Sequence, residues 1–190
     1  RTWLVCWDDN WNVRSKFLRN LANALWGITI SSPQCLPKPE SIKPCHETVI
    51  ECFRTTPFAF VECKKQGGVS TLSNKALRTY LDKEEYKKLL YREFDILDAN
   101  IYVCTNPLIY EFVQLYLTKH KCPGTQMTRV KSLDGKYEFE PSVTLHLPSK
   151  TVVLCSYHPS AIMSYEKYFK GVVSHYQAFV QSEYYFQFFK

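Results

Sequence analysis

The chain has 190 residues, 45% of them hydrophobic, and a formal net charge of +6. This composition argues against a disordered chain and predicts a single domain over residues 1–190 with a sizeable core. No run of about 18 apolar residues is present, so we expect no transmembrane helix and no membrane partner. The modest positive excess suits a polyanionic partner but does not establish one.

The first third of the chain alternates strand-like and helical segments. The chain starts at Arg1 rather than methionine, so we expect a few residues before it, and no signal peptide is visible. The segments predicted in chain order are a strand over residues 3–7, a helix over 15–26 that stops at Gly27, a proline-rich loop over 32–44 and a strand over 58–63.

The rest of the chain continues this alternation. The segments predicted are a long amphipathic helix over residues 74–97, a strand over 101–104, a helix over 108–117, a hairpin at Asp134-Gly135, an edge strand over 143–147, a core strand over 151–155 and a helix from about residue 164 to the C-terminus. Strands alternating with helices favour parallel pairing. We therefore predict an α/β fold, a three-layer α/β/α sandwich with a central, mostly parallel sheet.

Eight cysteines could suggest a disulfide or metal framework, but no two have the spacing Cys-x-x-Cys. Four of them, Cys6, Cys63, Cys104 and Cys155, lie in or at the end of strand-like runs. They are typical of small buried side chains in a reducing cytoplasm. A zinc site at Cys35, Cys45, His46 and Cys52 is the alternative, but structural zinc sites usually have tighter ligand pairs, so we expect no metal.

Polar residues follow three of the predicted strands. They are the Asp8-Asp9-Asn10 run, Glu62 and His158. Because the carboxyl ends of parallel strands meet at one edge of a sheet, we expect these residues to converge on one pocket.

The neighbours of His158 in the sequence restrict its backbone conformation. It opens the run His158-Pro159-Ser160-Ala161, directly after the predicted strand 151–155. Pro159 fixes its own φ and biases His158 towards an extended backbone. The alternative is an ordinary strand-to-helix turn in which the histidine is incidental.

Five segments together resemble the uracil-DNA glycosylase superfamily: LVCWDDN, FLRNLANALWG, FAFVECKKQGG, IYVCTN and VVLCSYHPSA. Their order and spacing agree with the superfamily over most of the chain, and HPSA is the most specific match. The first segment departs from the family's Gly-x-Asp/Asn-Pro, because it reads Cys6-Trp7-Asp8-Asp9. The resemblance implies a monomeric, monofunctional DNA glycosylase that extrudes a base from duplex DNA and hydrolyses its glycosidic bond without a cofactor.

The resemblance also implies roles for individual residues. Asp8 falls on the position that activates water and stabilises the cationic sugar, with Asp9 and Asn10 as competitors; Asn10 is also a candidate base-binding residue. His158 would donate a hydrogen bond to the departing base. Phe17 matches the aromatic that stacks on the base. The alternatives are a helix-capping acidic cluster, a structural histidine and a core phenylalanine.

Two loops match DNA-contacting segments. The wedge loop comprises Ser160, Ala161, Ile162 and Met163, of which Ile162 or Met163 could fill the gap left by an extruded base. The second loop, Lys64, Lys65, Gly67 and Gly68, could meet phosphates, although a solvated basic loop fits equally well. The cysteine pattern of the iron–sulfur branch of the superfamily is absent, so we expect no cluster.

Glu62 is the most telling departure from the superfamily. Uracil readers have an asparagine there, which both donates and accepts, whereas an ionised carboxylate only accepts. Glutamate is a partner for the N4 amino group of cytosine. We therefore predict a modified cytosine as the substrate, such as glucosylated or hydroxymethylated cytosine in phage DNA, in an antiviral enzyme. Three alternatives remain: ordinary uracil excision in repair, a non-catalytic binder of modified DNA, and a one-residue slip that turns Glu62 away.

Overall fold

In the computed structural model, residues 16–41, 46–63, 73–130 and 143–189 are described. The chain packs as two compact units. The first unit comprises residues 1–58, 132–137 and 157–190, and the second comprises residues 59–131 and 138–156. The single domain expected from length and composition stays a prediction.

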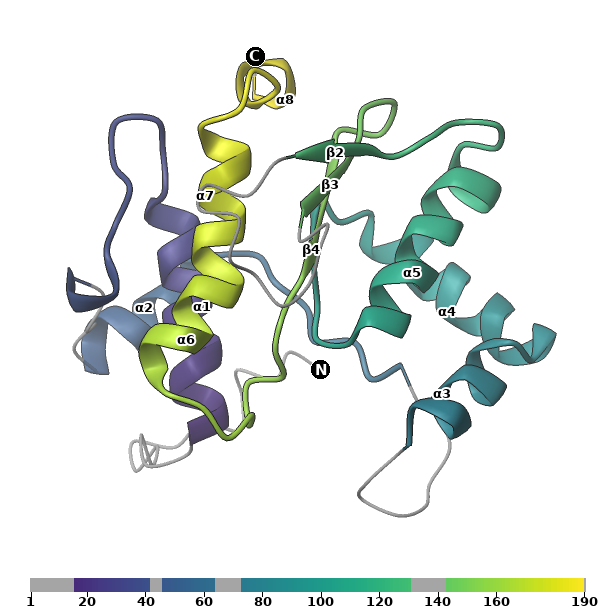
Figure 1. The fold of residues 1–190 in the computed structure, drawn as a ribbon, viewed down its shortest axis with the longest axis horizontal. Helices are drawn as coiled ribbons and strands as arrows, with labels where there is room; N and C mark the ends of the chain where they lie inside the picture. The colour runs from purple at the N-terminus through teal and green to yellow at the C-terminus, as the bar shows by residue number, and fades with distance from the viewer. Residues whose placement is uncertain (1–15, 42–45, 64–72, 131–142, 190) are drawn as a thin grey trace. The chain divides into compact units, whose positions relative to one another are not determined.

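The second unit contains a four-stranded sheet (Figure 1). Its strands are β1 (Ile101–Cys104), β2 (Thr128–Val130), β3 (Val143–His146) and β4 (Thr151–Cys155), in the order β1-β4-β3-β2. Among the strands that the structure describes, only β1 and β4 pair in parallel; the other two pairs are antiparallel. The mixed α/β class is confirmed, but the prediction of a mostly parallel sheet is wrong. Only residues 147–150 separate β3 from β4, and a parallel crossover needs a dozen residues or more.

β3 is an inner strand between β4 and β2, not the edge strand predicted. It carries two polar residues, Thr144 and His146, and both side chains are buried. Their polar atoms are satisfied inside the protein: Tyr110 donates its hydroxyl proton to Thr144 across 3.1 Å, and His146 bonds through both ring nitrogens. Buried polar groups that are paired in this way cost little, so the strand can lie between two others.

The proton on His146 can be assigned from its neighbours. Thr125 donates its hydroxyl proton to the Cys122 carbonyl at 2.6 Å, so it accepts from His146 Nε2 at 2.7 Å. The other ring nitrogen, Nδ1, then accepts from Ser149 at 2.6 Å. His146 is therefore neutral with its proton on Nε2. Burial, and secondarily the charge of Lys121, lowers the pKa of His146 below its usual 6.5.

Because of this lowered pKa, stability should fall as the pH drops below about 6.5. In that range the unfolded chain binds a proton on His146 that the folded chain does not, so the stability contributed above pH 6.5 is lost on acidification. One such proton gives a slope of at most about 1.4 kcal/mol per pH unit. Denaturant unfolding at pH 7.5 and 5.5 should show a smaller difference for His146→Gln than for the wild type. Equal differences in the two proteins would contradict the assignment.

Helices cover one face of the sheet in the second unit (Figure 1). α5 (Pro107–Leu115) is capped by Asn106 and continues as the π-helical stretch η3 (Tyr116–Lys121), which confirms the predicted helix over 108–117. Buried side chains of α5 and its neighbours pack against Val153 and Cys155 of β4.

The long helix predicted over residues 74–97 is two helices, α3 (Asn74–Leu81) and α4 (Glu84–Leu97). The break lies at Lys83, whose extended backbone begins α4. Two acidic residues in the first turn of α4 favour a helix start there, because they complement the helix dipole. Tyr80 and Tyr86 stack across the break with ring centroids 4.0 Å apart.

The described part of the first unit is mainly helical, and α1 (Lys16–Ile30) packs there against α6 (Tyr165–Phe169) and the π-helical stretch η4 (Lys170–Ser174) (Figure 1). α1 does not stop at Gly27 as predicted. Continuing the helix allows Ile28 and Ile30 to pack against this core, which offsets a glycine cost of about 1 kcal/mol.

The other elements of the first unit are α2 (His46–Thr55), η2 (Pro39–Ser41), α7 (His175–Val180) and α8 (Tyr185–Phe188). α2 was missed, although its buried Cys52 and Phe53 follow Val49 at helical spacing. The helix predicted from residue 164 to the end is interrupted between α7 and α8. The proline-rich loop is held in place by Gln177, which donates to the Pro37 carbonyl at 2.8 Å.

The strand predicted over residues 58–63 is not formed; this segment is irregular. Val61 packs against the core of the second unit, whereas Phe60 is 45% exposed, and Phe58 is 40% exposed although its ring contacts that of Phe53. The burial that would stabilise a central strand is therefore missing. The strand predicted over residues 3–7 and the turn at Asp134-Gly135 lie outside the described residues.

Candidate active site

The His158 loop follows the fully buried strand β4. In the parallel ladder, Cys155 of β4 pairs with Cys104 of β1, and the Ser156 amide extends the pairing by donating to the Cys104 carbonyl at 2.8 Å. His158 comes three residues after Cys155 in the chain. The prediction that a histidine closely follows this core strand is confirmed.

The loop is folded by its own hydrogen bonds. The Ala161 amide donates to the His158 carbonyl at 2.8 Å, and the Met163 amide donates to the Ala161 carbonyl at 3.0 Å. Pro159 is buried, whereas the side chains of His158 and Ser160 are exposed. The histidine is therefore presented to solvent from an ordered turn.

A backbone amide selects the tautomer of His158. The Ser160 amide donates to His158 Nδ1 at 3.2 Å. A ring nitrogen that accepts a hydrogen bond carries no proton, so neutral His158 holds its proton on Nε2. His158 can thus donate one hydrogen bond, from Nε2, to an external acceptor.

Phe17 lies beside this histidine. It is in the first turn of α1, and its ring centroid is 5.8 Å from that of His158, with the planes tilted by 45°. Phe17 is half-buried, so part of its surface remains open to solvent. The structure thus brings together two residues that the sequence assigned to one site, an aromatic surface and a hydrogen-bond donor.

The wedge loop presents one apolar side chain to solvent. Ile162 is fully exposed, whereas Met163 packs against the core of the first unit. Of the two apolar residues proposed for insertion into DNA, Ile162 is the one available for it. Ser160 is exposed and Ala161 is half-buried.

Glu62 is exposed and belongs to the second unit. The adjacent Cys63 lies close enough to Cys104, at the carboxyl end of β1, to affect it electrostatically. Burial first, and then the neighbouring Cys63 and Cys155 thiols, raise the pKa of Cys104 well above its usual value. Of residues 61–63, only Glu62 is exposed, while Val61 and Cys63 are half-buried.

The remaining predicted site residues lie outside the described part of the chain. They are Asp8 and Asn10, with the competitor Asp9, and the loop residues Lys64, Lys65, Gly67 and Gly68. Among the described residues, no group of three or more His, Cys, Asp or Glu side chains could hold a metal ion. The six cysteines described are free thiols.

One residue that contacts the loop was missed in the sequence. The side-chain amide of Asn20 on α1 is buried and donates to the Pro159 carbonyl at 2.7 Å. The available signal was a polar residue three positions after Phe17, and therefore near it on one side of the helix.

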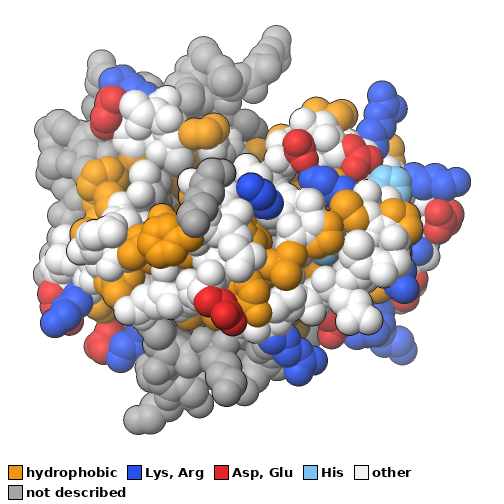
Figure 2. All heavy atoms as spheres, turned by 90° about the horizontal axis from the view of Figure 1, so that it is seen from above, with side chains coloured by type: hydrophobic (Ala, Val, Ile, Leu, Met, Phe, Trp, Pro, Cys, Tyr) orange, Lys and Arg blue, Asp and Glu red, His pale blue; other side chains and the backbone are white. Residues whose placement is uncertain are grey.

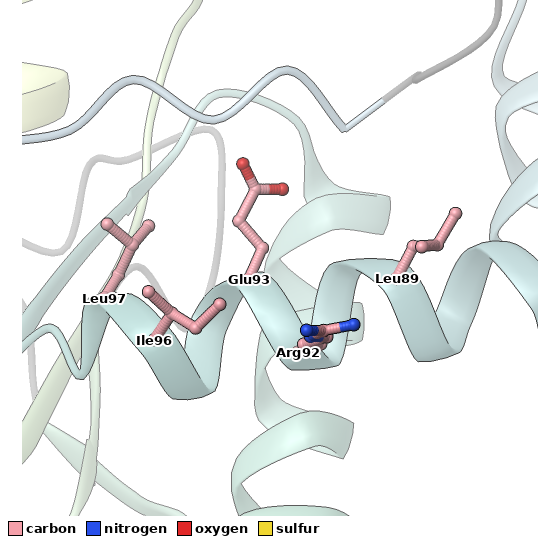
Figure 3. Close-up of a pocket in the computed structure, with 5 residues that line it drawn as sticks. All are labelled: Leu89, Arg92, Glu93, Ile96 and Leu97. Atoms are coloured by element: carbon pink, nitrogen blue, oxygen red, sulfur yellow. The ribbon is translucent and has the colours of Figure 1, made fainter. Parts of the chain in front are cut away.

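Two further features of the second unit contain none of the predicted site residues. A hollow of about 460 Å³ is lined by Leu89, Arg92, Glu93, Ile96 and Leu97, all from α4 (Figure 3). Separately, Asp95 accepts hydrogen bonds from Tyr116 at 2.8 Å and from His120 at 3.0 Å. Burial alone would raise the pKa of Asp95, but these bonds lower it below its usual value.

Charge on the surface does not by itself mark a nucleic-acid site. On the face shown in Figure 2, basic and acidic side chains are interspersed, without a block of one sign among the atoms described. No helix in the described ranges is long and apolar enough to span a membrane.

Searches of protein families, curated proteins and solved structures find no match to this chain.

Proposed function

We propose that the chain is a monofunctional DNA glycosylase that excises a modified cytosine, such as glucosylated hydroxymethylcytosine of phage DNA, and leaves an abasic site. The observation that carries the proposal is the pairing of His158 with Phe17. An exposed imidazole with a defined Nε2 donor lies beside an aromatic ring, and these are the two groups needed to bind and activate an extruded base.

In the proposed reaction, the target nucleotide rotates out of the duplex and its base stacks on Phe17. The bond between C1′ and the base nitrogen breaks, and its electron pair moves onto the base. His158 Nε2–H donates to the base oxygen that gains negative charge, which lowers the barrier because the donor is already oriented. Asp8 stabilises the cationic sugar and positions the water that adds to C1′; it accepts the proton that this water loses, and the released base anion takes up a proton from solvent.

Specificity and DNA binding complete the proposal. Glu62 accepts a hydrogen bond from the N4 amino group of a cytosine-type base, and Ile162 enters the space that the base leaves. Asn10 contacts the base as well, and Lys64, Lys65, Gly67 and Gly68 bind phosphates. The protein acts as a cytoplasmic monomer without a cofactor. We further propose that helices lie on both sides of the mixed sheet, as in the three-layer sandwich predicted from the alternation of strands and helices.

The proposal predicts cleavage in a panel of otherwise identical duplexes. Each contains a single uracil, cytosine, 5-hydroxymethylcytosine or glucosylated hydroxymethylcytosine, and alkali after incubation cuts the strand at any abasic site. We expect cutting at a modified cytosine and not at uracil. Cutting at uracil alone would make the protein a conventional repair enzyme. Tight binding of modified DNA without cutting would make it a non-catalytic reader.

A further inference from the structure

The loop that carries His158 is tied to α1 by a buried polar contact. Asn20 is 2% exposed, and its Nδ2 donates to the Pro159 carbonyl at 2.7 Å. An amide buried this deeply is costly unless it is hydrogen-bonded, so the contact fixes the loop as well as satisfying the side chain. Asn20 is one helical turn from Phe17. α1 therefore carries both the ring beside His158 and the side chain that bonds to Pro159, the residue after His158.

A second restraint acts on the other side of His158. Tyr157 packs against the core of the first unit, and its ring lies over Gly171 of η4. A Cβ atom at position 171 would lie 2.5 Å from two carbon atoms of this ring, closer than any side-chain contact allows. Glycine at this position is therefore what permits Tyr157 to approach the helix.

We propose that Asn20 and Gly171 are positioning residues for His158: they hold Pro159 and Tyr157, the residues on either side of it. With both neighbours fixed, the Ser160 amide keeps its bond to Nδ1 and the ring stays beside Phe17. The restraint is a feature of the loop itself. Its consequence for excision rests on the proposed function.

The first test measures the imidazole and not activity. Nitrogen-15 NMR of the five histidines, with His158 assigned through His158→Gln, should show His158 in the Nε2–H form in the wild type. In Asn20→Leu, the signals of the two His158 ring nitrogens should shift towards those of the tautomer mixture found in a free imidazole. Asn20→Asp, which keeps the size but cannot donate, should do the same, as should Gly171→Ala.

Asn23 provides a matched control on the same helix. It is also buried, and among the described residues it donates no hydrogen bond to the His158 loop, so Asn23→Leu should leave the His158 signals unchanged. Unchanged signals in both Asn20 variants, or an equal change in Asn23→Leu, would overturn the inference. If neither Asn20 variant folds, hydrogen exchange with solvent is measured on the wild-type protein instead. The side-chain amide protons of Asn20 should exchange more slowly than those of exposed Asn100, and equal rates would refute the contact.

The second readout is excision of glucosylated hydroxymethylcytosine from a duplex. A displaced donor should lower kcat by about 10- to 100-fold with little change in KM, because binding surfaces remain while the reactive geometry is lost. Wild-type protein that cuts no duplex in the panel, but shows the NMR differences above, would refute the proposed function and leave the positioning roles intact. Unchanged NMR signals in an active enzyme would refute the positioning roles alone.

Discussion

His158→Ala should lower the rate of base excision by about 100-fold or more while leaving DNA binding almost unchanged. The variant removes the Nε2 donor that we place on the departing base, and loss of one oriented donor of this kind costs about 10²- to 10³-fold in rate. Because the His158 side chain is exposed, we expect the folded structure to tolerate the change. Single-turnover excision of glucosylated hydroxymethylcytosine, with a parallel gel-shift titration, measures both quantities.

His120→Ala is the matched control for this prediction. His120 is also exposed, but it pairs with Asp95 in the second unit and holds none of the proposed roles. Excision by this variant should equal that of the wild type. A rate for His158→Ala within about threefold of the wild type would show that the histidine does not stabilise the leaving base.

Glu62→Asn should shift the preference of the enzyme from a cytosine-type base towards uracil. A carboxylate accepts a hydrogen bond from the N4 amino group but repels the O4 atom of uracil, whereas an amide can turn its donor towards O4. A good base-reading pair is worth about 1–3 kcal/mol, so the ratio of the two excision rates should change by about 10- to 100-fold. Parallel time courses on modified cytosine and uracil duplexes give this ratio.

Glu62→Asp separates the effect of the negative charge on base preference from the effect of side-chain length. It keeps the acceptor-only chemistry on a shorter side chain, so it should excise more slowly but retain the preference for a cytosine-type base. If Glu62→Asn leaves the ratio of rates as it is in the wild type, Glu62 does not read the base. In that case Glu62 points away from the bound base.

The sequence predicted local elements where one signal dominated. The strand 101–104, the strand 151–155 and the helix over 108–117 have strong apolar patterns, and each is present. Pairing direction depends on the length of the connection between two strands, and residues 147–150 are too few for the crossover that a parallel pair of β3 and β4 would need. β3 was misjudged because its polar residues bond inside the protein, a contact between distant segments that a local pattern does not contain.

The candidate site was likewise predicted only in part from the sequence. Proline next to His158 and the position after a buried strand indicated where the histidine would lie, and Phe17 lies beside it. The Nε2–H tautomer depends on where the Ser160 amide points, which follows from the folded turn. Asn20 was missed because its partner is a backbone carbonyl far along the chain, and a carbonyl has no sequence signature.

The most direct test of the account is detection of the released base. Wild-type protein is incubated with a duplex that contains one glucosylated hydroxymethylcytosine, and the small-molecule fraction is analysed by mass spectrometry beside that from His158→Ala. We predict free modified base in the wild-type reaction, in an amount equal to the abasic sites formed, and about 100-fold slower release by the variant. Intact modified duplex after prolonged incubation with excess folded wild-type protein would contradict the account.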